Sequence, residues 1–152
     1  MLYFDTSFIV PYILPESTSS RVQQFFIDQQ STNLAISHWT RIEFASMLAR
    51  EVRMQAMSEQ AARDADTRFE AVMAQSFLVL LPDRNDFELS KQYLARFETG
   101  LRSGDALHLA IGKNHGVEAF YTFDKKLLRA AKLLGLPARL LRSSICEERF
   151  NE

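Results

Sequence analysis

Short apolar runs alternate with longer stretches of helical periodicity along the chain. The runs at 1–4, 33–36, 77–81 and 119–123 have the length of buried strands, and polar or turn-forming residues end them. A shorter run at 138–141 has the features of an edge strand. This alternation is typical of a parallel sheet whose two faces are covered by helices, so we expect an α/β fold.

A helical hairpin is expected after the second strand, because a short break divides one long helical pattern. Ser58 is a good N-cap for the second helix of the pair, and Glu59 suits its first turn. The positions expected to face inward are Ile42, Ala45, Leu48, Ala49 and Val52 in the first helix and Ala62, Ala65, Phe69, Val72 and Met73 in the second.

The other helices carry recognisable start and stop signals. Ser7 is expected to cap a first helix at 8–14. Phe97 is expected on the apolar side of a later helix that Gly100 ends. The segment 106–111 is apolar nearly all round, which predicts a helix buried between neighbours.

At 152 residues the chain has the size of one domain. We place this domain at 1–145 and a polar C-terminal tail at 146–152. A content of 47% apolar and 24% charged residues is that of an ordinary globular protein. The only cysteine, Cys146, excludes an intramolecular disulfide and a zinc site built from cysteines.

Hydropathy and charge bear on location and partners. No stretch approaches the ~18 consecutive apolar residues of a membrane span, and the N-terminus lacks the features of a signal peptide, so we expect a cytoplasmic protein without membrane association. A net charge of −1 argues against broad coating by nucleic acid. Between 125 and 142, however, Lys and Arg occur without any Asp or Glu, and both a solvated helix face and a phosphate-binding surface fit this run.

Four acidic residues recur where a strand ends or the following helix begins. Asp5 ends the first strand and Asp124 follows the fourth. Glu43 and Asp105 lie near the starts of helices. In a parallel sheet these places share one edge, where α/β proteins collect ligands and chemistry. The four side chains are therefore expected to converge.

Each acid also has a purely structural explanation. Glu43 follows Thr40 at the spacing of a capping box. Asp124 is a natural N-cap, and Asp105 in a first turn suits the helix dipole. Asp5 could end its strand in an Asx turn. Taken together, however, several carboxylates at one partly buried edge repel one another unless a cation neutralises them. A site made only of oxygen ligands suits Mg²⁺ or Mn²⁺.

The sequence around these acids resembles that of PIN-domain ribonucleases. Residues 2–7, Leu-Tyr-Phe-Asp-Thr-Ser, look like the opening motif of that family. Glu43 in 39–43, Asp105 in 103–110 and Asp124 in 121–124 match the other three acidic positions in order and spacing. The length and the helical hairpin are similar to those of VapC toxins of type II toxin–antitoxin pairs. The resemblance implies a single PIN-like domain with a central parallel β-sheet flanked by helices.

The same resemblance implies a metal-dependent endoribonuclease. Asp5, Asp105 and Asp124 would bind Mg²⁺, with Mn²⁺ as a substitute, directly or through water, and Glu43 would complete the catalytic cluster. A bound metal lowers the pKa of its water and neutralises charge on the scissile phosphate. Hydroxyl groups beside the acids would orient carboxylates or contact phosphate; they belong to Thr6, Ser7, Ser103 and Thr122, and capping explains Ser7 and Ser103 equally well.

The resemblance also implies partners. The substrate would be RNA, the inhibitor would be an antitoxin protein whose tail wraps the toxin, and a second copy of the chain would form a homodimer.

Other interpretations remain open from the sequence. A non-catalytic module would keep the acidic pocket only to bind RNA or a protein partner. A phosphate-accepting Asp5 would need a second acid beside it and a lysine after a later strand, and no lysine precedes Lys91. His108 lies one turn after Asp105 and shares its helix face, where a buried, hydrogen-bonded histidine is a simpler expectation than a metal ligand.

Overall fold

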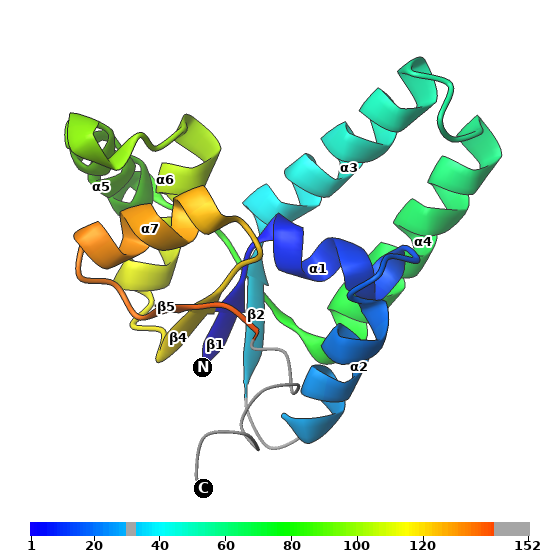
Figure 1. The fold of residues 1–152 in the computed structure, drawn as a ribbon, viewed down its shortest axis with the longest axis horizontal. Coiled ribbons are helices and arrows are strands. Elements are labelled where there is room, and N and C mark those ends of the chain that lie inside the picture. Colours follow the sequence, from blue (N-terminus) through cyan, green and yellow to red (C-terminus); the bar gives the residue numbers. More distant parts are fainter. Residues whose placement is uncertain (30–32, 142–152) are drawn as a thin grey trace, which may run out of the picture.

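The computed structural model describes residues 1–29 and 33–141, so the predicted tail at 146–152 and Cys146 lie outside the described residues. Strands alternate with helices as the sequence pattern predicts (Figure 1). The elements are β1 (Leu2–Phe4), α1 (Thr6–Ile13), α2 (Ser19–Asp28), β2 (Leu34–Ser37), α3 (His38–Arg53), α4 (Glu59–Ser76), β3 (Leu78–Leu80), α5 (Arg84–Leu94), η1 (Phe97–Thr99), α6 (Ser103–Asn114), β4 (Ala119–Tyr121), α7 (Lys125–Leu133) and β5 (Ala138–Arg139).

The strands form one parallel sheet in the order β3-β2-β1-β4-β5. β1 lies at the centre, where Leu2 is in register with Leu34 of β2 on one side and Ala119 of β4 on the other. The predicted α/β fold is therefore confirmed, and the last strand is an edge strand as expected. Because all strands run in the same direction, their carboxyl ends meet at one edge of the sheet.

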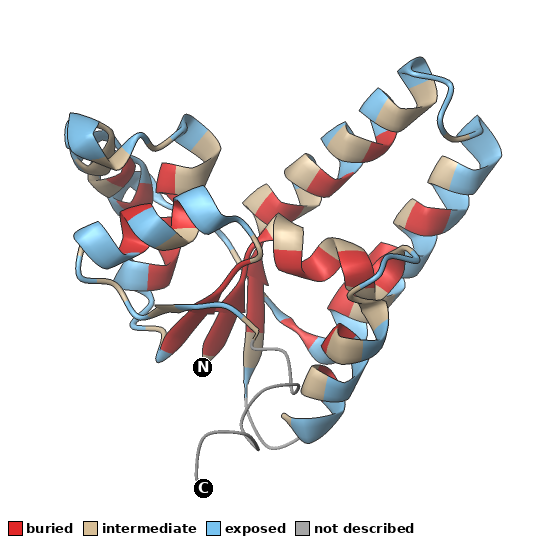
Figure 2. Ribbon diagram, viewed as in Figure 1, coloured by how far each residue is buried: buried red, intermediate tan, exposed pale blue. Residues whose placement is uncertain are grey.

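Helices cover both faces of the sheet (Figure 1). Phe4 of β1 joins a core with residues of α1 to α4, whereas its neighbour Tyr3 joins a second core with residues of α6 and α7. Successive side chains of a strand point to opposite faces, so three residues of β1 serve both cores. All three are buried, and β4 beside them is likewise buried along its whole length (Figure 2).

The helical hairpin is confirmed, with α3 and α4 extending away from the sheet (Figure 1). The inner face of α4 is confirmed, since Ala65, Phe69 and Met73 are buried. That of α3 differs from the prediction, because its buried residues are Thr40, Phe44 and Leu48, of which only Leu48 was expected. Phe44 stacks on Phe69 of α4 with ring centroids 4.3 Å apart. Ile42, expected to face inward, is 58% exposed. α3 carries two apolar stripes, and the sheet and α4 bury the one that contains Phe44.

The end of α5 also differs from the prediction. The helix ends at Leu94, and Phe97 lies in the following 3₁₀ turn with 88% of its surface exposed. Gly100, with φ of +64°, ends that turn rather than the helix. Phe97 therefore leaves the apolar side of α5 because the chain has already turned away.

No helix within residues 1–29 and 33–141 combines the length and the apolar character needed to cross a bilayer.

Candidate active site

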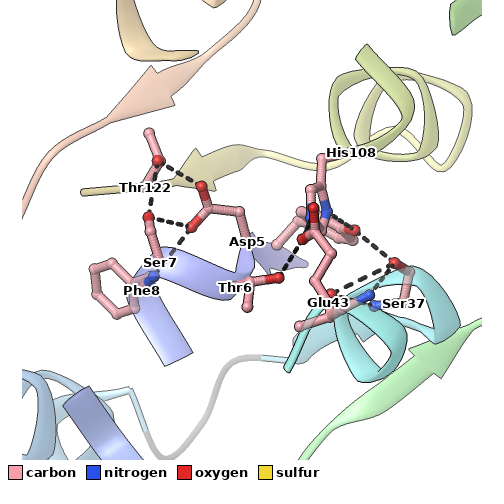
Figure 3. A network of polar contacts seen from close by, with 10 residues as sticks. Asp5, Thr6, Ser7, Phe8, Ser37, Glu43, His108 and Thr122 are labelled. Atoms are coloured by element: carbon pink, nitrogen blue, oxygen red, sulfur yellow. Dashed lines mark hydrogen bonds and ion pairs between the residues drawn. The ribbon is translucent and has the colours of Figure 1, made fainter. Parts of the chain in front are cut away.

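Asp5 lies at the junction of β1 and α1 and is almost completely buried. It is the N-cap of α1: its Oδ1 accepts a hydrogen bond from the backbone N–H of Phe8 at 3.0 Å. The prediction that Ser7 caps this helix is wrong, because the helix already begins at Thr6. The hydroxyl of Ser7 donates to Asp5 Oδ1 at 2.7 Å, and that of Thr122 donates to Oδ2 at 2.6 Å (Figure 3).

These donors do not fully compensate the burial of Asp5. Burial raises the pKa of its carboxyl, and the positive charge of His108 and the hydrogen bonds from Thr122, Ser7 and Phe8 only partly oppose that rise. A buried carboxylate in this state gains from a nearby cation.

Glu43 comes from the opposite side of the site, on the second turn of α3. Its Oε2 accepts hydrogen bonds from the hydroxyl of Thr6 and from Nε2 of His108, the latter at 2.6 Å (Figure 3). Burial alone would raise the pKa of Glu43, but the hydrogen bond and charge of His108 and the hydrogen bond from Thr6 outweigh it and lower that pKa. Glu43 is therefore held as an ionised carboxylate.

The capping role considered for Glu43 is wrong. The capping box of α3 is formed by Ser37 and Thr40, because the helix begins three residues earlier than that explanation requires. Glu43 therefore does not cap α3, and residues of α1 and α6 orient its side chain instead.

His108 links Glu43 to the interior of the protein. Glu43 belongs to the acidic edge, the carboxyl edge of the sheet toward which Asp5, Glu43, Asp105 and Asp124 lie. It is 2% exposed, and its Nδ1 lies 2.7 Å from the hydroxyl of Tyr3, which donates in turn to Ser37 Oγ at 2.9 Å. The expectation of a buried, hydrogen-bonded histidine is confirmed. The network of Tyr3, Ser37, His108 and Glu43 was not predicted. Tyr3 carried a signal for it, because a buried phenol needs a hydrogen-bond partner.

Asp105 and Asp124 approach the site from the starts of α6 and α7. Burial raises the pKa of Asp105, and the negative charges of Asp124 and Glu43 raise it further. Asp124 is exposed and caps α7, with its Oδ1 accepting from the backbone N–H groups of Lys126 and Leu127. Its own N–H donates to Thr122 Oγ1 at 2.9 Å, so Thr122 bridges Asp124 and Asp5.

Of the four predicted supporting hydroxyls, three contact an acid. They are those of Thr6, Ser7 and Thr122. Ser103 is the exception within the described part of the chain: it is the first residue of α6, exposed, and the preceding Arg102 occupies the N-cap position. Neither Ser7 nor Ser103 is an N-cap, so the capping explanation fails for both.

Gly104 is a site residue that was not predicted from the sequence. A Cβ at this position would lie 2.8 Å from Glu43 Oε1 and 3.1 Å from Trp39 Nε1. Real Cβ atoms do not approach a neighbour as closely as the first of these distances. Gly104 therefore lets the first turn of α6 pack directly against Glu43.

The donor set suits a hard divalent cation, but not as a complete protein cage. Within the described residues, no three His, Cys, Asp or Glu side chains come together as a ready coordination group. Mg²⁺ commonly takes a small number of carboxylates and completes its shell with water and substrate phosphate. Asp105 and Asp124, whose charges repel, fit such an ion. A direct metal bond from Asp5 stays a prediction.

Comparison with known families decides the identity of this arrangement. The model of the PIN domain matches residues 2–133. The chain belongs to the PIN domain family. A search of curated protein sequences found no match to the chain.

Solved structures agree with the PIN domain fold. VapC20 of Mycobacterium tuberculosis, described as a sarcin-ricin loop cleaving toxin, has a TM-score of 0.69 and 16% identity over 90% of this chain and 96% of its own. FitAB bound to a DNA fragment gives a TM-score of 0.72 and 18% identity over 93% and 95%. VapBC-1 of nontypeable Haemophilus influenzae has a TM-score of 0.68 and 13% identity over 93% of this chain and 98% of its own. At these identities the likeness concerns the fold.

Proposed function

We propose that this PIN domain is a Mg²⁺-dependent endoribonuclease that acts as the toxin of a toxin–antitoxin pair. The observation that supports the proposal is the position of the four acidic residues toward the carboxyl edge of one parallel sheet, where the charges of Asp124 and Glu43 reach Asp105. Two of them, Asp5 and Asp105, have raised pKa values, mainly because they are buried. Mn²⁺ is expected to replace Mg²⁺, because both accept oxygen ligands.

The residues divide the work of hydrolysis between them. Asp105 and Asp124 would hold the ion, with Asp5 binding it directly or through water. When bound, Mg²⁺ supplies charge neutralisation at the scissile phosphate and lowers the pKa of bound water. Glu43, ionised and held by Thr6 and His108, would orient the attacking water. Ser7 and Thr122 keep the Asp5 carboxylate in one orientation.

Several features support RNA and an antitoxin as partners. VapC20, a structural neighbour, is described as a toxin that cleaves the sarcin-ricin loop. Two other neighbours are described as FitAB bound to a DNA fragment and as VapBC-1. We therefore propose an RNA substrate, an antitoxin that covers the acidic edge, and a homodimer. A cytoplasmic location suits an enzyme that acts on cellular RNA.

The direct test is cleavage of structured RNAs by the purified chain with and without EDTA. We expect Mg²⁺-dependent cleavage by the parent and none by Asp5→Asn. Asn is itself a good N-cap, so α1 should remain folded. The matched control is Asp83→Asn, because Asp83 caps α5 in the same way and lies outside the acidic site.

Two outcomes would contradict the proposal. Cleavage by Asp5→Asn at the parent rate would remove Asp5 from the active site, and cleavage unaffected by EDTA would exclude the metal mechanism. RNA binding by the parent without cleavage under any divalent ion would favour the alternative function, a non-catalytic PIN domain that binds RNA or a protein through its acidic pocket.

A further inference from the structure

A hollow of about 480 Å³ opens directly beside the acidic edge. α3 lines one side of it, and the start of α6 lines the other. Glu43 and Asp105 are part of its wall. Any extended substrate whose scissile bond lies at these carboxylates therefore has a space next to it for the neighbouring unit.

Three arginines also line this hollow. Arg50 and Arg53 come from the last turn of α3, and Arg102 is the N-cap residue of α6. Arg50 forms an exposed ion pair with Glu51 at 3.0 Å. Arg53 and Arg102 are exposed, and among the described residues neither forms a salt bridge or a side-chain hydrogen bond. Two guanidinium groups are thus available to an anionic ligand, and their fork of donors matches phosphate.

Between the acids and the arginines the wall is largely apolar. Trp39, Ile42 and Met47 line it. Ile42 is 58% exposed, which the packing of α3 against the sheet does not explain. The indole nitrogen of Trp39 is buried and lies beside Gly104 and Glu43. A flat, partly apolar group would cover the apolar side chains that line the hollow.

We propose that this hollow binds the nucleotide adjacent to the scissile phosphate of a single-stranded RNA segment. The base would lie against Trp39, Ile42 and Met47, and the phosphate of that nucleotide would contact Arg53 and Arg102. A ligand that carries both an aromatic ring and an anion would use both the apolar and the cationic residues of the lining. Single-stranded nucleic acid is recognised in this way, by stacking surfaces combined with cations. The inference rests on the proposed nuclease function and adds a subsite to it.

Trp39 is the only tryptophan of the chain, so it reports on the hollow directly. The experiment titrates a short single-stranded RNA into Asp5→Asn protein, which should not cut it, and follows tryptophan fluorescence. We expect saturable quenching. In Arg53→Ala/Arg102→Ala, made in the same background, the midpoint should rise by about tenfold or more, since hydrogen bonds to charged groups are lost. The salt dependence should weaken by about 0.7 in the log–log slope for each phosphate contact removed.

Arg68→Ala is the matched control. Arg68 is an exposed arginine of α4, carries the same charge and does not line the hollow. Its midpoint should equal that of the background protein. Circular dichroism and thermal unfolding check that all variants fold.

The outcomes separate this inference from the function on which it rests. Equal midpoints in all three proteins, with a parent that cleaves RNA, would overturn the subsite alone. A parent that neither binds nor cleaves RNA would overturn both. The double variant could instead keep its RNA binding but change the molecular mass in solution or the capture of an antitoxin. That result would make the hollow a protein interface and would also overturn the subsite.

Discussion

At the scale of single residues, His108 fixes the orientation of the Glu43 carboxylate. The two ring nitrogens contact the hydroxyl of Tyr3 and the carboxylate of Glu43, so the ring cannot rotate without breaking a buried hydrogen bond. His108 and Glu43 are 65 positions apart in the chain. The sequence could suggest a buried histidine from its apolar helix, but not which carboxylate it would meet.

We expect His108→Leu to lower the rate of RNA cleavage by about 10–100-fold, as for other residues that orient a catalytic group. His108→Gln should retain more activity, because an amide can still donate to Glu43. Without His108 the pKa of Glu43 rises, so the acid limb of the pH–rate profile should move to higher pH. Single-turnover rates across pH measure both effects, with the exposed His115→Gln as control. A parent-like profile in His108→Leu would refute this role.

At the scale of elements, the site depends on how closely α6 approaches α3. Gly104 provides that approach, because any side chain there meets Glu43 Oε1. Glu43 cannot easily give way, since Thr6 and His108 hold its other oxygen. The start of α6 therefore fixes the position of Asp105, one residue further on, relative to Glu43.

We expect Gly104→Ala to reduce cleavage by up to about a hundredfold, because a small displacement of catalytic groups has effects of this size. Gly112→Ala is the matched control: it lies in the same helix, and its Cβ would meet only Val117 and Phe120, at 3.3 and 3.4 Å. Cleavage rates and thermal unfolding should be measured together. If both variants lose activity only in proportion to stability, Gly104 has no specific role in the site.

The order and type of the elements were predictable because strand and helix periodicities differ clearly along this chain. The inward face of α3 was not, since Ile42 and Phe44 both lie on apolar stripes and only the positions of the sheet and α4 decide between them. Helix starts were predictable at Ser58 and Asp124, where the cap follows a clear break. At Ser7 the prediction was off by two positions, because Asp5 both ends the strand and caps the helix.

At the scale of the whole molecule, the acidic edge has a cost in stability. Burial raises the pKa of Asp5 above its ordinary value. A group of this kind contributes stability that is fully present below its unfolded pKa of about 3.9, and this contribution is lost as the pH rises through the folded pKa. Ionisation of Asp5 in the fold therefore lowers the free energy of unfolding unless a cation is bound.

We expect Asp5→Asn to have a higher melting temperature than the parent in the absence of divalent ions, by a margin that grows as the pH rises above about 4. Each kcal/mol should correspond to about 2–4 °C for a chain of this length. Mg²⁺ should raise the melting temperature of the parent and shrink the margin. Asp83→Asn should show no such growth. A margin that is flat or falls with pH would contradict the cost assigned to Asp5.

The candidate site was partly predictable at this scale. All four acids could be proposed because each follows a strand or lies in the first two turns of a helix, and a parallel sheet brings those places toward one edge. Tyr3, Ser37 and Gly104 could not be chosen, because their roles depend on contacts between elements that leave no periodic signal. The hollow beside Glu43 likewise exists only once α3 and α6 are packed.

The most direct test of the acidic site is anomalous diffraction from crystals soaked in Mn²⁺. The ion should lie at the carboxyl edge of the sheet with oxygen ligands from Asp105 and Asp124, and it should disappear in Asp105→Asn. A manganese peak far from these acids, or none at a concentration that supports RNA cleavage, would contradict a metal centre at this edge.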